Sequence, residues 1–261
     1  TFIMKQKFTI LFDLDGTLVD TAPDLMHAHN HVMKKFGYPT KSTEQIRNLV
    51  GQGAGAMLGR SIWGQAKKEF SKVNDEKIKK EMVSEFVDFY GKNIINESTL
   101  INGVKEFLKW CKEKNISMAV CTNKQEYLSN DLLKKIGIYD YFEYVAGSDT
   151  FDYCKPDPRH LTTVVEILDG DLKKTIMIGD SETDANAAKA AEIPMILLED
   201  GYTEKNIDEI YHNHLIKDFI GIDADFAALA SVSLSPIIKL FLISPFIISI
   251  VLVRCLGSGL Q

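Results

Sequence analysis

The chain has 261 residues, which is enough for one large domain or two modest ones with a buried core. Its apolar fraction of 45% and charged fraction of 25% are ordinary for globular proteins and exclude a disordered or collagen-like chain. The formal net charge of -6 argues against nucleic acid as a partner, because binding to a phosphate backbone needs a basic face. A small phosphate ester needs only local positive charge and is compatible with this balance.

The N-terminus and the cysteines bear on the cellular compartment. No long apolar segment precedes Lys7, so the N-terminus does not resemble a signal peptide. The four cysteines form no CxxC pair and no zinc-type spacing, which indicates reduced thiols. We therefore expect a cytoplasmic protein.

The first predicted element is a buried strand over 8–12, an apolar run that ends at Asp13. A helix begins near Pro23 and is stopped by Gly37. The stretch from 41 to 93 is helical in character, contains no convincing strand and is interrupted by a glycine-rich turn over 50–55.

From about residue 98 the pattern alternates between helices and strands. The predicted helices cover 103–114, 124–136, 158–168 and 183–191, and the predicted strands cover 116–122, 142–146, 175–180 and 194–198. Such alternation is typical of βα crossovers and a parallel sheet, and the nearly continuous apolar strands suit a sheet covered on both faces.

We therefore predict an α/β fold with a Rossmann-like, doubly wound parallel sheet. Residues 1–20 and 95–228 would form the core, 21–94 would be an inserted helical cap, and 229–261 would be an apolar tail of uncertain status.

Polar residues follow three of the predicted strands, namely Asp13, Thr122 and Asp180. In sheets of this kind ligands bind beyond the carboxyl ends of the strands, so we expect these residues to converge on one site. Asp13 and Asp15 lie two residues apart and can face one cavity. Crowded carboxylates favour a cation between them, and one could attack phosphorus while the other transfers protons. An acidic turn that only ends a strand remains the alternative for an isolated pair.

Three other segments also have a structural and a functional interpretation. The acidic cluster over 179–184 is either a helix N-terminus, with its cap and a favourable first-turn charge, or part of a metal site. Lys155, beside two prolines, is either a surface lysine or a fixed positive charge for a phosphate. Thr122 and Asn123 are either a helix cap or donors to a ligand.

Together and in this order, these segments resemble the haloacid dehalogenase-like phosphatase superfamily over residues 8–200. The motifs are Asp13-Leu14-Asp15-Gly16-Thr17 after a strand, a strand that ends in Thr122, then Lys155, and finally Gly179-Asp180-Ser181 with Asp184. The sequence over 13–25 is similar to the phosphoglycolate phosphatase branch, and the helical insertion matches the cap of that branch.

The resemblance implies specific roles for the motif residues. The implied catalytic residues are Asp13, Asp15 and Lys155. The implied phosphate ligands are Gly16, Thr122, Asn123 and Lys155, and the implied Mg²⁺ ligands are Asp13, Asp15 and Asp180, with Asp184 in support. In this scheme Asp13 is the nucleophile, and Asp15 protonates the leaving alkoxide and then activates water. The positive charges of the metal and Lys155 suit phosphoryl transfer, which depends mainly on positioning and charge neutralisation.

We therefore predict a Mg²⁺-dependent phosphatase that acts on a small phosphorylated metabolite, with 2-phosphoglycolate as the expected substrate. The alternatives within the superfamily are a pyrophosphatase and a sugar-phosphate phosphatase or mutase. The alternative from another class is a non-catalytic, membrane-attached binding protein that has kept the fold.

Features outside the motifs leave further alternatives. The turn over 50–55 could approach the substrate through its backbone N–H groups or be an ordinary turn, and we expect Arg47 and Arg60 beside it to be solvated. His27 and His31 share a helix face, but we expect no carboxylate near them to complete a metal site. Glu192 stands where similar proteins have glycine, so a positive φ there would cost about 1 kcal/mol.

The C-terminal tail differs in composition from the rest of the chain. The run over 240–253 is uncharged, with Lys239 and Arg254 at its ends, and is shorter than the roughly 20 residues that a bilayer span needs. The tail could be a membrane anchor, a helix packed on a partner, or non-native sequence from a shifted reading frame.

Overall fold

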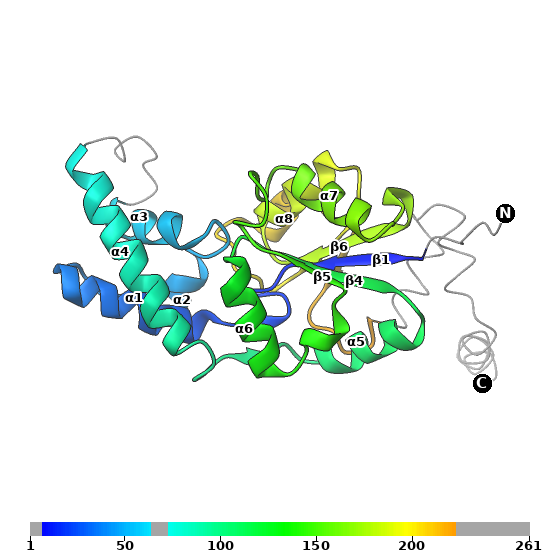
Figure 1. Cartoon of the computed structure of the whole chain (residues 1–261), viewed down its shortest axis with the longest axis horizontal. Helices are drawn as coiled ribbons and strands as arrows, with labels where there is room; N and C mark the ends of the chain where they lie inside the picture. Colours follow the sequence, from blue (N-terminus) through cyan, green and yellow to red (C-terminus); the bar gives the residue numbers. More distant parts are fainter. Residues whose placement is uncertain (1–6, 64–72, 223–261) are drawn as a thin grey trace, which may run out of the picture.

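The computed structural model describes residues 7–63 and 73–222 (Figure 1). Its centre is a six-stranded sheet in the order β5-β4-β1-β6-β7-β8, in which every neighbouring pair is parallel. The strands are β1 (Thr9–Phe12), β4 (Ser117–Cys121), β5 (Tyr144–Ala146), β6 (Thr175–Gly179), β7 (Met195–Leu198) and β8 (His214–Ile216). The predicted parallel sheet is confirmed, and the edge strand β8 was not predicted.

The order of the strands reverses around β1. From β1 the chain first builds outward through β4 and β5, and then crosses to β6 on the other side of β1. Such a switch point leaves a crevice at the carboxyl ends of the central strands, where ligands bind in open α/β sheets. Asp13, the residue directly after β1, therefore lies at this crevice.

Helices cover both faces of the sheet, as the doubly wound prediction requires. Figure 1 shows α5 (Val104–Glu113) and α6 (Glu126–Ile136) on one face and α7 (Arg159–Ile167) and α8 (Glu182–Ala190) on the other. The side chains of successive residues of β1 point to opposite faces of the sheet, as they do along any strand. Ile10 and Phe12 belong to one apolar core, and Leu11 belongs to the other.

The residues between β2 and β3 form a helical cap beyond the carboxyl ends of the strands (Figure 1). Its helices are α1 (Ala22–Phe36), α2 (Thr43–Arg47), α3 (Ala54–Trp63) and α4 (Val73–Lys92). Helix α1 packs on α2 and α4, and α3 packs on α4. The helical character predicted for 41–93 holds for the described part of that range.

Two short strands join the cap to the core. β2 (Val19–Asp20) and β3 (Thr99–Leu100) pair in antiparallel fashion, so both chain connections cross side by side. Asp24 in the first turn of α1 fastens this crossing. Its buried carboxylate accepts bonds from the backbone N–H groups of Glu97 and Ser98 and from the Ser98 hydroxyl, the last at 2.6 Å.

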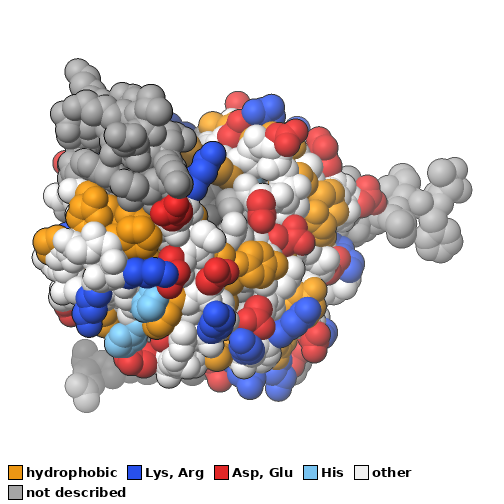
Figure 2. Space-filling view, turned by 60° about the vertical axis from the view of Figure 1, so that its left-hand side comes forward, with side chains coloured by type: hydrophobic (Ala, Val, Ile, Leu, Met, Phe, Trp, Pro, Cys, Tyr) orange, Lys and Arg blue, Asp and Glu red, His pale blue; other side chains and the backbone are white. Residues whose placement is uncertain are grey.

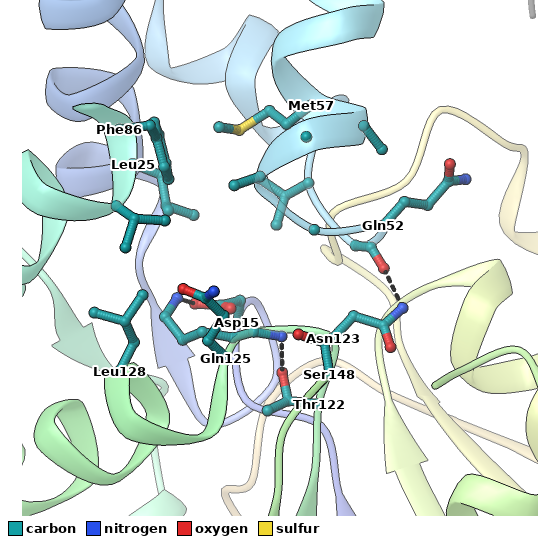
Figure 3. A pocket seen from close by; sticks show the side chains of 18 of the residues that line it. Asp15, Leu25, Gln52, Met57, Phe86, Thr122, Asn123, Gln125, Leu128 and Ser148 are labelled. Atoms are coloured by element: carbon teal, nitrogen blue, oxygen red, sulfur yellow. Dashed lines mark hydrogen bonds and ion pairs between the residues drawn. The ribbon is translucent and has the colours of Figure 1, made fainter. Parts of the chain in front are cut away.

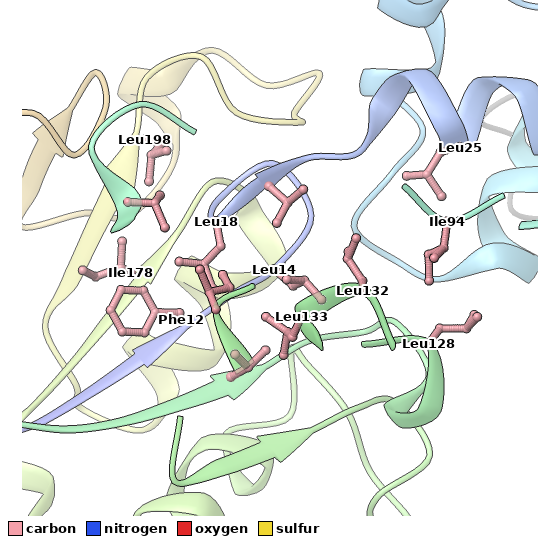
Figure 4. Packing of buried hydrophobic residues seen from close by; sticks show 14 of the residues in the cluster. Phe12, Leu14, Leu18, Leu25, Ile94, Leu128, Leu132, Leu133, Ile178 and Leu198 are labelled. Atoms are coloured by element: carbon pink, nitrogen blue, oxygen red, sulfur yellow. The ribbon is translucent and has the colours of Figure 1, made fainter. Parts of the chain in front are cut away.

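One apolar cluster continues from the sheet into the cap (Figure 4). Phe12 and Ile178 represent the sheet in this cluster, and Leu25 and Ile94 represent the cap side. Leu132 and Leu133 of α6 lie between these two groups. Burying such side chains stabilises a contact by about 25 cal/mol per Å² of apolar surface, so the cap is held against the core by packing as well as by its connections.

Several local predictions can be checked directly. Helix α1 ends at Gly37, whose φ is 77°, as expected for a glycine C-cap. Glu192 has a φ of 56°, so a non-glycine residue does occupy a left-handed position there. Charged side chains of both signs are interspersed over the described part of the face in Figure 2.

Within residues 7–63 and 73–222, no helix is long and apolar enough to cross a bilayer. The tail that was singled out over 229–261 lies outside the described residues.

Candidate active site

A buried cluster of four charged side chains lies at the carboxyl edge of the sheet. Lys155 donates to Asp13 Oδ1 at 2.8 Å and to Asp184 Oδ1 at 2.5 Å. Carboxylate oxygens of Asp13, Asp180 and Asp184 all lie within 4.8 Å of one another. The Lys155 side chain is only 2% exposed, so the interpretation of this residue as a surface lysine is wrong.

The segments that carry these residues are held by their own backbone contacts. The Asp13 N–H donates to the Ile178 carbonyl at 2.9 Å, which fixes the end of β1 beside β6. Asp184 lies in the first turn of α8, and its Oδ2 accepts from the Ser181 N–H at 3.1 Å and the Ser181 hydroxyl at 2.7 Å. Asp184 therefore contacts the start of α8 through one oxygen and the buried cluster through the other.

One ammonium group pairs with two of the three buried carboxylates, and the pKa values reflect both burial and crowding. Burial raises the pKa of Asp13 to about 6, with Lys155 opposing the shift and Asp184 adding to it. Burial and the neighbouring Asp13 and Asp184 raise the pKa of Asp180 well above its usual range. Burial alone would lower the pKa of Lys155, but Asp13 and Asp184 outweigh burial and raise it. The cluster therefore has an excess of negative charge, which favours a further cation.

Close packing around Asp180 depends on glycine. Gly16 has a φ of 84°, and a Cβ added there would lie 2.3 Å from Asp180 Oδ2. A Cβ on Gly201 would lie 2.3 Å from the Asp180 carbonyl oxygen. Each backbone passes so near to Asp180 that only glycine fits. Gly16, a predicted phosphate ligand, therefore has at least this steric role.

Asp180 is also linked to the cap connection through Tyr202, which the sequence analysis did not identify. The Tyr202 N–H donates to Asp180 Oδ2 at 2.6 Å, and its hydroxyl donates to Asp20 of β2. Arg47 of the cap donates to the other Asp20 oxygen at 2.6 Å and lies over the Tyr202 ring. This network connects one carboxylate of the cluster to the crossing between core and cap.

Asp15 lies beside the cluster and has a lysine of its own. Lys124 donates to Asp15 Oδ1 at 2.6 Å, and the Thr21 hydroxyl donates to the same oxygen at 2.6 Å. The described residues place no hydrogen bond on Asp15 Oδ2. Lys124 is 6% exposed and lies 4.5 Å from the centre of the Tyr90 ring. The sequence analysis did not identify Lys124, although its position directly after Thr122 and Asn123 was an available signal.

Thr122 and Asn123 lie at the end of β4, as predicted. The Thr122 hydroxyl and the Asn123 amide nitrogen have protein partners, whereas Asn123 Oδ1 is buried without one among the described residues. The Thr122 hydroxyl accepts from the Lys124 N–H at 3.2 Å. The Asn123 amide donates to the carbonyls of Gly51 at 3.1 Å and Lys155 at 2.9 Å. Asn123 thus connects the glycine-rich turn of the cap with the loop that carries Lys155.

A cavity of about 340 Å³ lies between the cap and the core, above Asp13 and Asp15. Figure 3 shows Asp15, Thr122 and Ser148 at its floor, and Leu25, Phe86 and Met57 on the cap side. The glycine-rich turn over 50–55 lines one wall. The structure therefore brings the predicted residues Asp13, Asp15, Thr122 and Asn123 to one cavity, with Lys155 and Asp180 buried directly beneath Asp13.

Two arginines and two histidines of the cap have roles that differ from the expectations. Arg47 and Arg60 are not simply solvated: Arg47 pairs with Asp20, and Arg60 donates to the Leu49 carbonyl at the start of the glycine-rich turn. His27 and His31 have carboxylate partners that the sequence analysis did not identify. His27 contacts Glu97 at 2.8 Å and His31 contacts Glu85 at 2.7 Å, so each histidine has a separate partner. Within the described chain, these contacts do not form a cluster of three ligands.

Known proteins resemble the chain in sequence and in structure. A family model described as haloacid dehalogenase-like hydrolase matches residues 10–198. A phosphoglycolate phosphatase from Mesorhizobium japonicum is 36% identical over 218 residues, which cover 84% of this chain and 94% of that protein. A phosphoglycolate phosphatase from Caulobacter vibrioides is 37% identical over 214 residues, which cover 82% of this chain and 88% of that protein.

The structural comparison agrees with the sequence relatives. The crystal structure of a predicted phosphoglycolate phosphatase from Haemophilus somnus has a TM-score of 0.75 and 31% identity, and it covers 84% of this chain and 97% of its own. The chain thus shares its fold and much of its sequence with a class of hydrolases. The chain belongs to the haloacid dehalogenase-like hydrolase family. Its relatives confirm the predicted phosphoglycolate phosphatase branch.

Proposed function

We propose that this protein is a Mg²⁺-dependent phosphomonoester hydrolase that acts through an aspartyl-phosphate on Asp13, with 2-phosphoglycolate as its substrate. The single observation that carries the proposal is the contact between Lys155 and Asp13 at 2.8 Å, beneath a cavity that the cap covers. The relatives named phosphoglycolate phosphatase support the choice of substrate.

The donor set suits Mg²⁺. Asp13 and Asp180 offer hard carboxylate oxygens within 4.8 Å of each other. Burial and the neighbouring carboxylates raise their pKa values, and a divalent cation would offset the repulsion between them. Asp13 and Asp180 would hold the ion together with the Asp15 carbonyl. Both Asp184 oxygens already accept hydrogen bonds, so Asp184 would support the site. Bound Mg²⁺ would supply positive charge to the phosphate and help to align it.

The remaining chemistry can be assigned to side chains. Lys155 occupies Asp13 Oδ1, and the described residues place no hydrogen bond on Oδ2, which is therefore the oxygen that attacks phosphorus. As the P–O bond to the leaving group breaks, Asp15 Oδ2 donates a proton to the departing oxygen and the alcohol is released. Asp15 then accepts a proton from the water that attacks phosphorus. The bond to Asp13 breaks, and inorganic phosphate leaves.

The lining of the cavity agrees with this sequence of steps. Lys124 and Thr21 both bond to Asp15 Oδ1, which leaves its second oxygen available for the proton. Leu25, Met57 and Phe86 cover the site with apolar surface, which would exclude bulk water during the reaction.

Phosphate release across a panel of small esters tests the proposal. The panel holds 2-phosphoglycolate, pyrophosphate and several sugar phosphates, each with Mg²⁺, and Asp13→Asn is the control variant. We expect the highest kcat/KM for 2-phosphoglycolate and no turnover by the variant. A preference for another ester would overturn the substrate, full activity of Asp13→Asn would overturn the mechanism, and a folded protein that hydrolyses none of the esters would favour a binding function.

A further inference from the structure

Lys124 is the single cation among the described residues that line the cavity. The charged side chains in that lining are Asp13, Asp15 and Lys124, because Lys155 lies beneath Asp13 and outside the lining. The phosphate needs the groups around Asp13, so Lys124 is the cation available to any second charge on the substrate. This inference rests on the proposed function, because it assumes that a phosphate ester occupies the cavity.

The bonding of Lys124 leaves capacity for a ligand. An ammonium group has three N–H donors, and the described residues provide one oxygen acceptor for it, Asp15 Oδ1 at 2.6 Å. The Tyr90 ring, 4.5 Å away, supports the positive charge but accepts no conventional hydrogen bond. At 6% exposure the Lys124 side chain has little access to bulk water. A buried ammonium with unused donors favours an anionic ligand.

The location of Lys124 also restricts where that anion lies on the substrate. Lys124 is one hydrogen bond from Asp15, and in the proposed reaction Asp15 meets the ester oxygen. An anionic group attached to the ester carbon therefore comes within reach of the ammonium. On the opposite wall, Leu25, Met57 and Phe86 offer no partner to hydroxyl groups farther along a substrate. Burying such hydroxyls without partners is unfavourable.

We propose that Lys124 is a specificity-determining residue, which binds a carboxylate on the ester carbon of the substrate and holds it beside Asp15. A short phosphorylated acid satisfies both this lysine and the apolar wall. A phosphate ester with an uncharged alkyl group would leave the ammonium donors unused. A sugar phosphate would place hydroxyls against the apolar wall.

A comparison of two substrates on two proteins tests this assignment. The substrates are 2-phosphoglycolate and ethyl phosphate, which has a methyl group in place of the carboxylate, and the proteins are the full chain and Lys124→Met. Both activities fall in the variant, because Asp15 loses its ion pair. We expect the ratio of kcat/KM for the acid over ethyl phosphate to fall by about 30-fold or more, as for loss of a charge-assisted hydrogen bond. Unfolded protein cancels from this ratio, because both substrates are measured on one preparation.

Two further variants make the test specific. Lys134→Met removes a lysine of α6 that also lies over a tyrosine ring, 4.8 Å from the Tyr139 centre, but outside the cavity. We expect this variant to leave the ratio unchanged. Lys124→Arg keeps the charge and should recover part of the ratio. Equal losses for both substrates in Lys124→Met would overturn the assignment.

Equilibrium binding separates this inference from the proposed hydrolysis. Calorimetry of 2-phosphoglycolate and ethyl phosphate with Asp13→Asn, with and without Lys124→Met, gives the same ratio without turnover. A wild-type chain that hydrolyses neither ester would overturn the proposed function alone, provided that the acid binds more tightly and that Lys124→Met removes the preference. The absence of any preference for the acid in binding would overturn the role of Lys124.

Discussion

The two sides of the cavity differ in what they present to it. The core side presents charged groups such as Asp13, which is bonded to Lys155. Lys155 and Asp184 lie behind Asp13 as buried charges outside the cavity lining. The cap side presents apolar side chains such as Leu25 and Phe86. Charged pairs of the cap, such as Lys35 and Glu85, lie between its helices and outside the cavity lining.

The core and the cap therefore contribute to the reaction in different ways. The ends of parallel strands hold charged groups rigidly, so the core can fix the position and electrostatics that phosphoryl transfer requires. Apolar helices can close over a ligand and exclude water with little effect on the charges below. Changes in the core should therefore reduce kcat strongly, and changes at the boundary with the cap should act mainly on KM.

The largest effect is expected when the buried lysine is removed. In Lys155→Met, Asp13 and Asp184 lose their ammonium partner while their oxygens lie within 4.8 Å of each other and of Asp180. Breaking a buried ion pair by removing one partner costs about 3–5 kcal/mol, which we expect as a loss of unfolding free energy in urea at pH 7 with EDTA. With Mg²⁺, kcat on 2-phosphoglycolate should fall roughly 1000-fold, as for loss of a preorganised donor.

An exposed lysine that also forms an ion pair provides the matched control. Lys205 pairs with Glu182 of α8, but the two side chains are 46% and 42% exposed. We expect Lys205→Met to change stability by less than about 0.5 kcal/mol, because exposed pairs contribute little. Similar losses in the two variants would contradict the view that burial gives the core cluster its importance.

A second prediction concerns a buried histidine of the core, on the helix α7 that follows the Lys155 loop. His160 is fully buried, and burial together with the nearby charge of Lys155 lowers its pKa from 6.5 to about 4. The unfolded chain therefore binds a proton between pH 6.5 and 4 that the folded chain does not bind. The contribution of His160 to the free energy of unfolding is fully present above pH 6.5 and is lost as the pH falls toward 4. The loss is about 2 kcal/mol at pH 5.

Urea unfolding of wild type and His160→Gln at pH 7, 6 and 5 measures this loss. Glutamine does not titrate, so the variant should lose about 2 kcal/mol less than wild type between pH 7 and 5. His27→Gln, measured in parallel, provides the background slope for removal of a histidine whose side chain is 47% exposed. Parallel slopes for wild type and His160→Gln would show that this histidine does not contribute to acid sensitivity.

Much of the core could be predicted from sequence, because its signals are local. The apolar run of β1 followed by Asp13 and Asp15 needed only strand length and the turn after it, and the later strands repeated the pattern. β2 and β3 have two residues each and β8 has three, which is too short for any periodicity to appear. These strands form because of their pairing partners, and a segment of two or three residues has no sequence pattern that identifies its partner.

The same holds for the site: some of its residues can be predicted from neighbouring sequence, and others depend on contacts with residues distant in sequence. Asp13 and Asp180 could be predicted because each follows a recognisable strand. Tyr202 could not, because its importance comes from contacts with Asp180 and Asp20, which are 22 and 182 residues away in sequence. The partners of His27 and His31 were missed for the same reason, since Glu97 and Glu85 come from segments 70 and 54 residues distant.

The smallest expected effect concerns the hydrogen bond between cap and core at Asn123. The Asn123 amide donates to the Gly51 carbonyl of the cap and to the Lys155 carbonyl of the core. Removing this bridge in Asn123→Ala should cost about 1 kcal/mol of cap closure, and thus raise KM for 2-phosphoglycolate roughly fivefold with little change in kcat. Asn123→Asp keeps the shape but places an acceptor against two carbonyl oxygens, so its KM should rise further.

The inhibition constant for inorganic phosphate separates this role from the predicted phosphate contact of the Asn123 side chain. If that amide binds phosphate, inhibition by phosphate should weaken as much as KM rises and kcat should also fall. If the amide acts as a bridge to the cap, the inhibition constant for inorganic phosphate should rise less than KM does, because inorganic phosphate lacks the organic portion that the cap covers.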